Sequence, residues 1–510
     1  MTHYPSTVVI DLSFTGKLNQ LEGEPSRDSE HPSPLIHVLD DYSLLHIFSL
    51  YRPAVLDETE VDNDQILEGG EWYRERWWYE LVQVCRRWRH IVFESASHLR
   101  LSLVCARGTP VADMLAHSPP LPLVIDHLDQ NHDITAEDHD EEGIILALQH
   151  RDRVRRVRLR KSIPILQKII NALDGEFPIL EYLYIRYRKF LRPMAEHNVS
   201  FNLPETFRAP HLRHLLLRNF DIPIESPLLT TMGNLITLSL STIPPSAYFH
   251  PNALLQRLSL MPQLETLGIT FHNYYPSRDV ERQLMHMPIM MRVTFPNLRW
   301  LAFQGASAYL EALLPWVTIP LLEKIQVYFF NQLTYSIPHL QQFMSTAGNL
   351  RPKTATLTFG KDYLHVKAYP HKGTRISTLS MLLSGRHLDW QVASTAQVFH
   401  TLGTVFSAVE HLTLESDRHF MSSEWNNEAD PTQWRDLLGA FGNVKTLQVG
   451  YGLVEQLSRA LQPGEGESPT ELLTKLQELS YFSIGASHNE FTLFVDACQK
   501  AGRPITMVCS

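Results

Sequence analysis

From about residue 151 onward, one spacing of apolar positions recurs along the chain: apolar-x-x-apolar-x-apolar. Ten segments follow this spacing: VRRVRL (154–159), LEYLYI (180–185), LRHLLL (212–217), LITLSL (235–240), LETLGI (264–269), LRWLAF (298–303), LEKIQV (322–327), VEHLTL (409–414), VKTLQV (444–449) and LSYFSI (479–484). TATLTF (354–359) is a weaker copy, and apart from the steps across it the copies begin 23 to 35 residues apart. A regular period of this length is typical of solenoid proteins, in which each repeat packs only on its neighbours.

The alternating end of each copy predicts a short strand, because successive side chains of a strand point to opposite faces. Residues 151–510 are therefore expected to form an α/β solenoid with a parallel inner sheet and outer helices. The positions expected to stack as inward neighbours are Leu183, Leu215, Leu238, Leu267 and Leu301. Residues 364–390 break the period and are expected to form an irregular insert with longer strands. The alternative is an ordinary α/β domain in which the similarity of the segments is accidental.

Two helical patterns precede the repeats. In LDDYSLLHIFSLYRP, one helix face is spaced i, i+3, i+4, i+7, and Asp40 or Asp41 is placed to cap its start. A second helix is expected where apolar residues recur at Trp77, Leu81, Val84, Trp88, Ile91 and Val92. The chain then divides into a flexible tail over 1–33, a helical module over 34–108 with a loop insert at 53–71, a connector over 109–150, and the repeats over 151–510.

Composition narrows the class of protein. The 45 basic and 55 acidic residues give a net charge of −10, which provides no general attraction to nucleic acid. Four cysteines in 510 residues, without a C-x-x-C pair, favour reduced thiols and a location in the cytoplasm or the nucleus. No signal-peptide pattern and no run of 18 apolar residues occurs, so we expect no membrane association.

Sequence motifs for catalysis or cofactor binding are missing: there is no P-loop, no G-x-G-x-x-G after a strand and no G-x-S-x-G. His127, His132 and His139 lie in an acid-rich stretch from Asp126 to Glu142, but their spacing fits no known metal-ligand pattern. Charge-rich segments of this kind are usually solvated loops. We therefore expect a non-catalytic protein with no cofactor and no metal.

One charged feature is more specific. The segment RDRVRRVRLRK has seven basic residues in eleven positions, and its arginines at alternate positions share one strand face if Val157 and Leu159 point inward. Guanidinium groups suit carboxylate and phosphate, so this face predicts a site for an acidic or phosphorylated protein segment. The expected substrate-binding residues, with Arg160, Arg186 and Arg218 in register, are Arg156, Arg158, Arg160, Tyr182, Tyr184, Arg186, His214, Arg218 and Trp300. The alternative is a solvated strand face whose arginines pair with nearby acids.

The two helical segments together resemble the F-box motif. That family has a Leu-rich first helix, then a V-C-+-x-W-+-x-[IVL] helix, where + is a basic residue. The first part is matched by Leu44, Leu45, Ile47, Phe48 and Leu50, and the second by Val84, Cys85, Arg86, Trp88, Arg89 and Ile91. Two features differ from the family pattern: Val38-Leu39-Asp40 stands where the motif usually has Leu-Pro, and the 53–71 insert is long.

An F-box followed by leucine-rich repeats is a known arrangement, which this chain resembles over roughly 34–510. The resemblance implies docking on a Skp-family adaptor, and through it on a cullin, by Leu39, Leu44, Leu45, Phe48, Val84 and Trp88. It also implies the role of a substrate-recognition subunit of a ubiquitin ligase, which binds target proteins through its repeats. Two alternatives stay open. The helices could simply cap the first repeat and bury their own aromatic side chains, or the chain could be a repeat scaffold that never engages a ligase.

Overall fold

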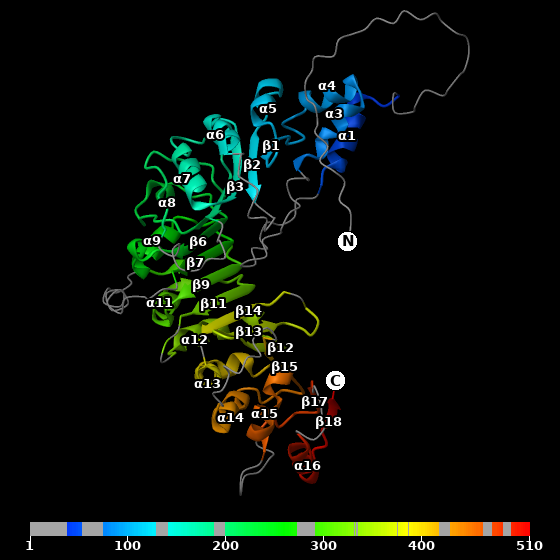
Figure 1. Cartoon of the computed structure of the whole chain (residues 1–510), viewed down its shortest axis with the longest axis vertical. Coiled ribbons are helices and arrows are strands. Elements are labelled where there is room, and N and C mark those ends of the chain that lie inside the picture. Colours follow the sequence, from blue (N-terminus) through cyan, green and yellow to red (C-terminus); the bar gives the residue numbers. More distant parts are fainter. Residues whose placement is uncertain are drawn as a thin grey trace, which may run out of the picture. The chain divides into compact units, whose positions relative to one another are not determined.

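A computed structural model of the chain describes residues 38–53, 75–128, 141–187, 199–272, 291–330, 332, 335–374, 376–385, 387–417, 429–462, 472–482 and 491–509. The tail expected over 1–33 and nearly all of the insert expected at 53–71 lie outside these residues. The protein is a mixed α/β structure in which parallel strand pairs predominate, with no closed barrel among the described strands (Figure 1). It divides into two compact units, Met1–Arg218 and Asn219–Ser510.

Unit 1 begins with a small helical module. Its elements are α1 (Asp41–Tyr51), the 3-10 turn η2 (Trp77–Tyr79), α3 (Leu81–Val84) and α4 (Arg86–Glu94). As expected, Asp40 caps α1, because its carboxylate accepts the backbone N–H of Ser43 at 2.6 Å. Leu44 and Phe48 on one face of α1 are buried, and the ring of Phe48 packs edge-on against Trp88 with centroids 4.8 Å apart.

The single helix expected to run from Trp77 to Val92 is broken at Cys85. This residue is extended, with φ −159° and ψ 170°, so α3 ends before it and α4 begins after it. Its sulfur accepts the backbone N–H of Trp88 at 3.5 Å and caps α4. Apolar spacing alone does not reveal the break, because an interruption of one residue leaves most of the helical spacing intact.

The rest of unit 1 is a parallel sheet with strand order β1-β2-β3-β4-β5. Its elements are β1 (Leu103–Ala106), α5 (Val111–His117), β2 (Leu123–Leu128), α6 (Glu141–Gln149), β3 (Val154–Lys161), α7 (Ile163–Ala172), β4 (Tyr182–Tyr187) and β5 (His214–Arg218). The helices α5, α6 and α7 lie beside one another along one face of this sheet (Figure 1). Leu183 and Leu215 are register partners and fully buried, as the repeat spacing predicts.

The connector expected over 109–150 is corrected by the structure. β2 pairs in parallel with both β1 and β3, and α5 packs against α6, so this region supplies strands and helices to the sheet rather than a connector. The sequence of β2 is LVIDHL. Asp126 and His127 interrupt its apolar run, which hides the strand from a search for the repeat spacing.

Unit 2 has the same plan, with strand order β6-β7-β9-β11-β14-β13-β12-β15-β16-β17-β18 and a separate parallel pair of β8 and β10. Its strands are β6 (Thr237–Ile243), β7 (Thr266–Phe271), β8 (Val293–Thr294), β9 (Trp300–Gly305), β10 (Val317–Thr318), β11 (Lys324–Phe329), β12 (Thr354–Phe359), β13 (Tyr363–Tyr369), β14 (Leu379–Ser384), β15 (His411–Ser416), β16 (Thr446–Val449), β17 (Glu478–Tyr481) and β18 (Thr506–Cys509). Leu238 pairs with Leu267 and Leu267 with Leu301, and all three are buried, as expected.

The helices of unit 2 connect these strands. They are α8 (Pro227–Thr230), α9 (Pro251–Leu258), α11 (Ser307–Leu313), α12 (Pro338–Thr346), α13 (Leu388–Phe406), α14 (Pro431–Gly439), α15 (Val454–Leu461) and α16 (Thr492–Lys500), with 3-10 turns at η3 (Pro245–Ala247), η4 (Leu314–Trp316), η5 (Gly348–Leu350) and η7 (Tyr451–Leu453). Neighbouring helices from α9 to α15 pack on one another in chain order. In the described part of the chain, no helix combines the length and the apolar character needed to cross a membrane.

Two departures from a uniform repeat occur in unit 2. β13 lies antiparallel between β12 and β14, within the stretch expected to be an irregular insert, and the 19-residue helix α13 then carries the chain to β15. The strand expected at LSYFSI is shifted. In β17, Leu479 pairs with Leu447 and Tyr481 with Val449, so LQELSY rather than LSYFSI follows the register of the preceding strand. Tyr481 is buried, whereas the expected spacing had Phe482 at an inward position.

Charges of alternating sign stand at the starts of neighbouring strands. In unit 1, Arg155 pairs with Glu181 at 3.0 Å. In unit 2, Glu410, which directly precedes β15, lies between Lys353 at 3.0 Å and Lys445 at 2.8 Å. Hydrogen bonds and attraction from the two lysines lower the pKa of Glu410 to about 2. Opposite charges at equivalent positions of adjacent strands favour the observed register over a slipped one.

We expect the Phe48→Ala variant to lower the free energy of unfolding of the module by about 3 kcal/mol, because it removes a buried ring from the contact between α1 and α4. Guanidinium-chloride unfolding followed by tryptophan fluorescence measures this loss. Tyr42→Ala is the matched control on the same helix. Tyr42 is 80% exposed, so its loss should change stability by less than about 0.5 kcal/mol. Equal effects of the two changes would contradict the packing described for Phe48.

Candidate functional site

The residues expected to dock an adaptor do not share one environment. Leu44 and Phe48 are buried within the module, which corrects the expectation that they face a partner. Both sit on the side of α1 that packs against α4, where burying an apolar side chain is most favourable. Leu39, Leu45 and Trp88 are half-buried. Val84, at the end of α3, is 58% exposed and remains open to solvent.

The opposite side of α1 carries apolar residues that the expected set left out. Tyr42 and Leu50 are 80% and 73% exposed and, with Leu45 and the exposed His46, follow the spacing of one helix face. We call Val38, Tyr42, Leu45, Leu50 and Val84 the module patch. The signal for it lies in the sequence, because Leu45 and Leu50 fall outside the stripe that contains Leu44 and Phe48.

Polar contacts hold the module patch in a defined geometry. The guanidinium of Arg87 on α4 donates to the Asp41 carboxylate at 2.7 and 2.9 Å and to the backbone carbonyl of Leu39 at 2.5 Å. These bonds fix the start of α1 against α4. The Tyr51 hydroxyl donates to Glu80 at 3.0 Å and ties the end of α1 to the turn before α3. The exposed apolar side chains therefore stand on a braced pair of helices.

The expected register of the basic strands is confirmed. Arg156 pairs with Tyr182 and Tyr182 with His214, while Arg160 pairs with Arg186. Continuing the β4–β5 register by one residue places Arg218 beside Arg186. We call the side of β3, β4 and β5 that carries these residues the arginine face. Side chains at equivalent positions of neighbouring strands stand about 4.8 Å apart, so the face presents rows of cationic and aromatic groups.

Arg158, at the centre of the arginine face, is not available to a partner. It is buried in an ion pair with Asp126 of β2 at 3.2 Å, and the two side chains are only 7% and 6% exposed. Its register neighbour Tyr184 is also buried. The expectation that Arg158 and Tyr184 contact a substrate is therefore wrong. A buried guanidinium requires a close counter-charge, and β2 provides it from the region that had been expected to be a connector.

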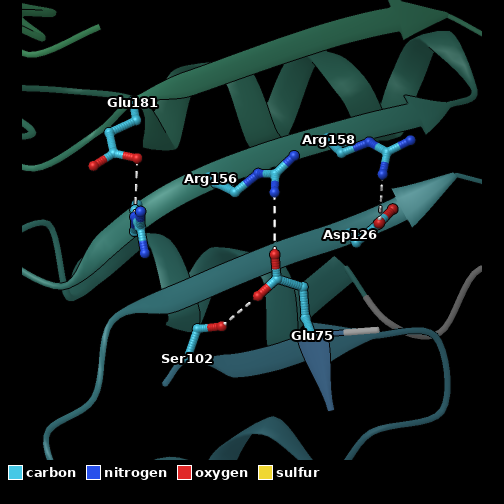
Figure 2. Close-up of polar contacts among 7 residues, drawn as sticks. Glu75, Ser102, Asp126, Arg156, Arg158 and Glu181 are labelled. Carbon is cyan, nitrogen blue, oxygen red and sulfur yellow. Dashed lines mark hydrogen bonds and ion pairs between the residues drawn. The ribbon is translucent and has the colours of Figure 1, made fainter. Parts of the chain in front are cut away.

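Arg156 has a different counter-charge. One carboxylate oxygen of Glu75, just before η2, accepts from the Arg156 guanidinium at 3.1 Å, and the other accepts from the hydroxyl of Ser102 at 3.0 Å (Figure 2). The guanidinium also lies over the ring of Tyr182, 5.0 Å from its centroid. The alternative of a strand face with paired arginines thus holds for Arg156 and Arg158. Neither acid could be assigned from the sequence, because Glu75 is 81 residues away and Asp126 is 32 residues away.

The remaining expected contacts fall into two groups. Arg160, Arg186 and Arg218 are half-buried at one end of the arginine face. His214 is half-buried beside Tyr182, with ring centroids 5.5 Å apart, and burial followed by repulsion from Arg213 and Arg156 lowers its pKa to about 4. Trp300 belongs to unit 2, where it is buried and lies 5.0 Å from the amino group of Lys324. Because Trp300 is buried, the expectation that it is an exposed recognition residue is wrong.

The histidines of the acid-rich stretch are only partly described. His127 is buried in β2, where burial and the nearby Lys161 and Arg107 lower its pKa to about 3. His132 and His139 lie outside the described residues. Over the described ranges, no three His, Cys, Asp or Glu side chains gather in a way that could hold a metal ion.

A scan against protein-family models and a search of curated proteins found no match for this chain.

We expect Arg158→Leu to lower the free energy of unfolding by about 3–5 kcal/mol, because it leaves the Asp126 carboxylate buried without its counter-charge. The double change Arg158→Leu and Asp126→Leu should recover most of this loss, since it removes both charges. The measurement is a double-mutant cycle, in which urea unfolding is followed for the wild type, both single variants and the double variant. Additive single effects, without recovery in the double variant, would contradict a buried pair.

The environment of His127 predicts a pH dependence of stability. Its pKa in the folded chain, about 3, lies below its ordinary value of 6.5, so the unfolded chain binds a proton that the folded chain excludes. Stability should therefore fall as the pH is lowered from about 6.5 towards 3, by up to about 1.4 kcal/mol per pH unit. In His127→Leu, the slope of the free energy of unfolding against pH should be smaller between about pH 3 and 6.5, by up to about 1.4 kcal/mol per pH unit. Equal slopes of the urea midpoint against pH in the two proteins would disprove the assignment.

Proposed function

We propose that the chain is a substrate-recognition subunit of a Skp–cullin–F-box ubiquitin ligase, with no active site of its own. The observation that carries this proposal is the module patch, which leaves large apolar side chains exposed on helices that resemble an F-box. Leu50 and Val84 are 73% and 58% exposed. Large exposed apolar side chains on a small helical module favour docking of a protein partner.

The module is suited to docking by its construction. Leu44, Phe48 and Trp88 pack inside it, and the Arg87–Asp41 pair at 2.7 Å braces α1 against α4. The surface therefore needs little ordering when a partner binds, which lowers the entropic cost of association. The Skp-family adaptor implied by the F-box resemblance would contact Val38, Tyr42, Leu45, Leu50 and Val84, and would join the chain to a cullin.

The strand–helix units fit the second half of the proposed role. We infer that they are leucine-rich repeats of a solenoid, supported by parallel strands whose inward leucines are register neighbours within each unit. Repeats of this kind offer a long surface for target proteins. We place the target site at the ends of the arginine face, at Arg156 with Tyr182 and His214 and at Arg160 with Arg186. An acidic or phosphorylated segment suits these groups, and a ligase of this class acts in the cytoplasm or the nucleus.

A second candidate is a repeat scaffold that binds partners without engaging a ligase. One observation favours it: the module also packs on its own sheet, where the indole N–H of Trp78 donates to the backbone carbonyl of Ser102 at 3.2 Å. In this role the helices chiefly cover the first strand, and the module patch has no adaptor to bind. The two candidates differ in one property, which is capture of a Skp-family adaptor.

We expect the wild type to capture a Skp-family adaptor, and the double change Leu50→Asp with Val84→Asp to reduce capture at least about tenfold. Docking would bury two carboxylates without partners, which is strongly unfavourable. Because both residues are exposed, the fold should tolerate the changes. A pull-down with purified adaptor, followed by calorimetric titration, measures the effect.

Leu493→Asp is the matched control, since Leu493 is a leucine 62% exposed on α16 of unit 2. It should leave capture unchanged. A wild type that captures no adaptor would favour the scaffold, and equal capture by all variants would remove the module patch from the interface.

A further inference from the structure

The contact between Glu75 and Arg156 places an acid of the chain itself on the face proposed to receive acids of a target. We propose that Glu75 is an internal competitor, which occupies a carboxylate-binding subsite formed by Ser102, Arg156 and Tyr182 until an acidic side chain of the target displaces it. This inference rests on the proposed target site, and it adds both the chemistry of that site and a control on its access.

The geometry around Glu75 is that of carboxylate recognition. Its two oxygens are bound separately, one by the Ser102 hydroxyl at 3.0 Å and the other by the Arg156 guanidinium at 3.1 Å. The ring of Tyr182 lies beneath the guanidinium, 5.0 Å from its centre, and fixes its orientation. Figure 2 shows the Glu75 carboxylate between Ser102 and Arg156. A carboxylate from another chain could make the same two bonds.

The exposure of the pair makes exchange possible. The Glu75 and Arg156 side chains are 32% and 19% exposed, whereas those of Asp126 and Arg158 are 6% and 7% exposed. A partly solvated ion pair contributes little stability, because water screens the charges, so it can open without unfolding the chain. The buried pair cannot be exchanged in this way, since opening it would leave two charges in an apolar environment. The arginine face therefore has a fixed centre and an exchangeable position at Arg156.

The spacing of the face defines the target segment. Arg156 and Arg160 are four residues apart on β3, which corresponds to about 13 Å along an extended strand. An extended segment running along β3 would match both arginines with acidic or phosphorylated residues at positions i and i+4. Between them, Arg158 is already neutralised by Asp126, so the residue at position i+2 of the target segment needs no charge.

Tethering gives Glu75 its effect. A group on the same chain competes at an effective concentration in the millimolar range, which reduces the apparent affinity of a weak external acid. Loss of a partly solvated ion pair of this kind corresponds to a change in affinity of about two- to fivefold. Glu75 lies just before η2 of the helical module, so a residue of the module itself also regulates the subsite.

The test uses the full-length chain and a fluorescein-labelled nonapeptide of Gly and Ser with glutamates at its third and seventh positions, or phosphoserines at the same positions. Fluorescence anisotropy gives the dissociation constant. We expect Glu75→Gln, which keeps the shape of the side chain but removes its charge, to bind both peptides about two- to fivefold more tightly than the wild type. Arg156→Gln should weaken binding about tenfold, because it removes the cation that receives the acid.

Glu323→Gln and Arg299→Gln are control variants, because they remove the two partners of an Arg–Glu pair in unit 2 whose side chains are 53% and 55% exposed, and neither should change binding. Weaker binding by Arg156→Gln without tighter binding by Glu75→Gln would overturn Glu75 as a competitor and leave the target site in place. Failure of both peptides to bind the wild type and Glu75→Gln at about 1 mM would overturn the subsite itself. Adaptor capture by the same variants reports separately on the ligase role, since none of these residues belongs to the module patch.

Discussion

The structure depends on one constraint: a short strand followed by a helix cannot bury its apolar side by itself. In unit 1, Leu183 is covered because Leu215 stands beside it in register, and in unit 2 Leu267 lies between Leu238 and Leu301. Each strand supplies an inward row that only a neighbouring strand and helix can complete. The repeated spacing, the parallel pairing and the helices along one side all follow from this requirement.

Once the inward rows are fixed, the alternate side chains have to point to the other face, whatever their charge. This explains how three arginines come to share one face of β3. Their environments then diverge. Arg158 lies where water is excluded and needs the fixed partner Asp126, whereas Arg156 is partly solvated and has the more exposed partner Glu75. The same residue type thus becomes a structural element at one position and a candidate recognition group two residues earlier.

The helical module shows the same division within a single helix. Leu44 and Phe48 on α1 complete a small core with Trp88, and Tyr42 and Leu50 on the other side remain exposed. The core gives the helix a fixed orientation, and the exposed side is then presented as a rigid surface. A surface of this kind favours association, because little conformational entropy remains to be lost. The proposed adaptor docking and the proposed target site therefore both use side chains that remain at least partly exposed after the core has packed.

The sequence by itself determined what depends on local spacing: the repeat period, the α/β class, the cap at Asp40, the inward leucines and the register that aligns Arg160 with Arg186. Faces of strands and helices follow from the order of neighbouring residues, so they can be predicted from one chain. Only the tertiary structure decided the strand character of β2, the break at Cys85, the antiparallel position of β13 and the burial of Phe48. It alone assigned Glu75 and Asp126 to their arginines, because ion pairs form between residues distant in sequence. Their partners are chosen by proximity in the folded chain, which no local pattern records.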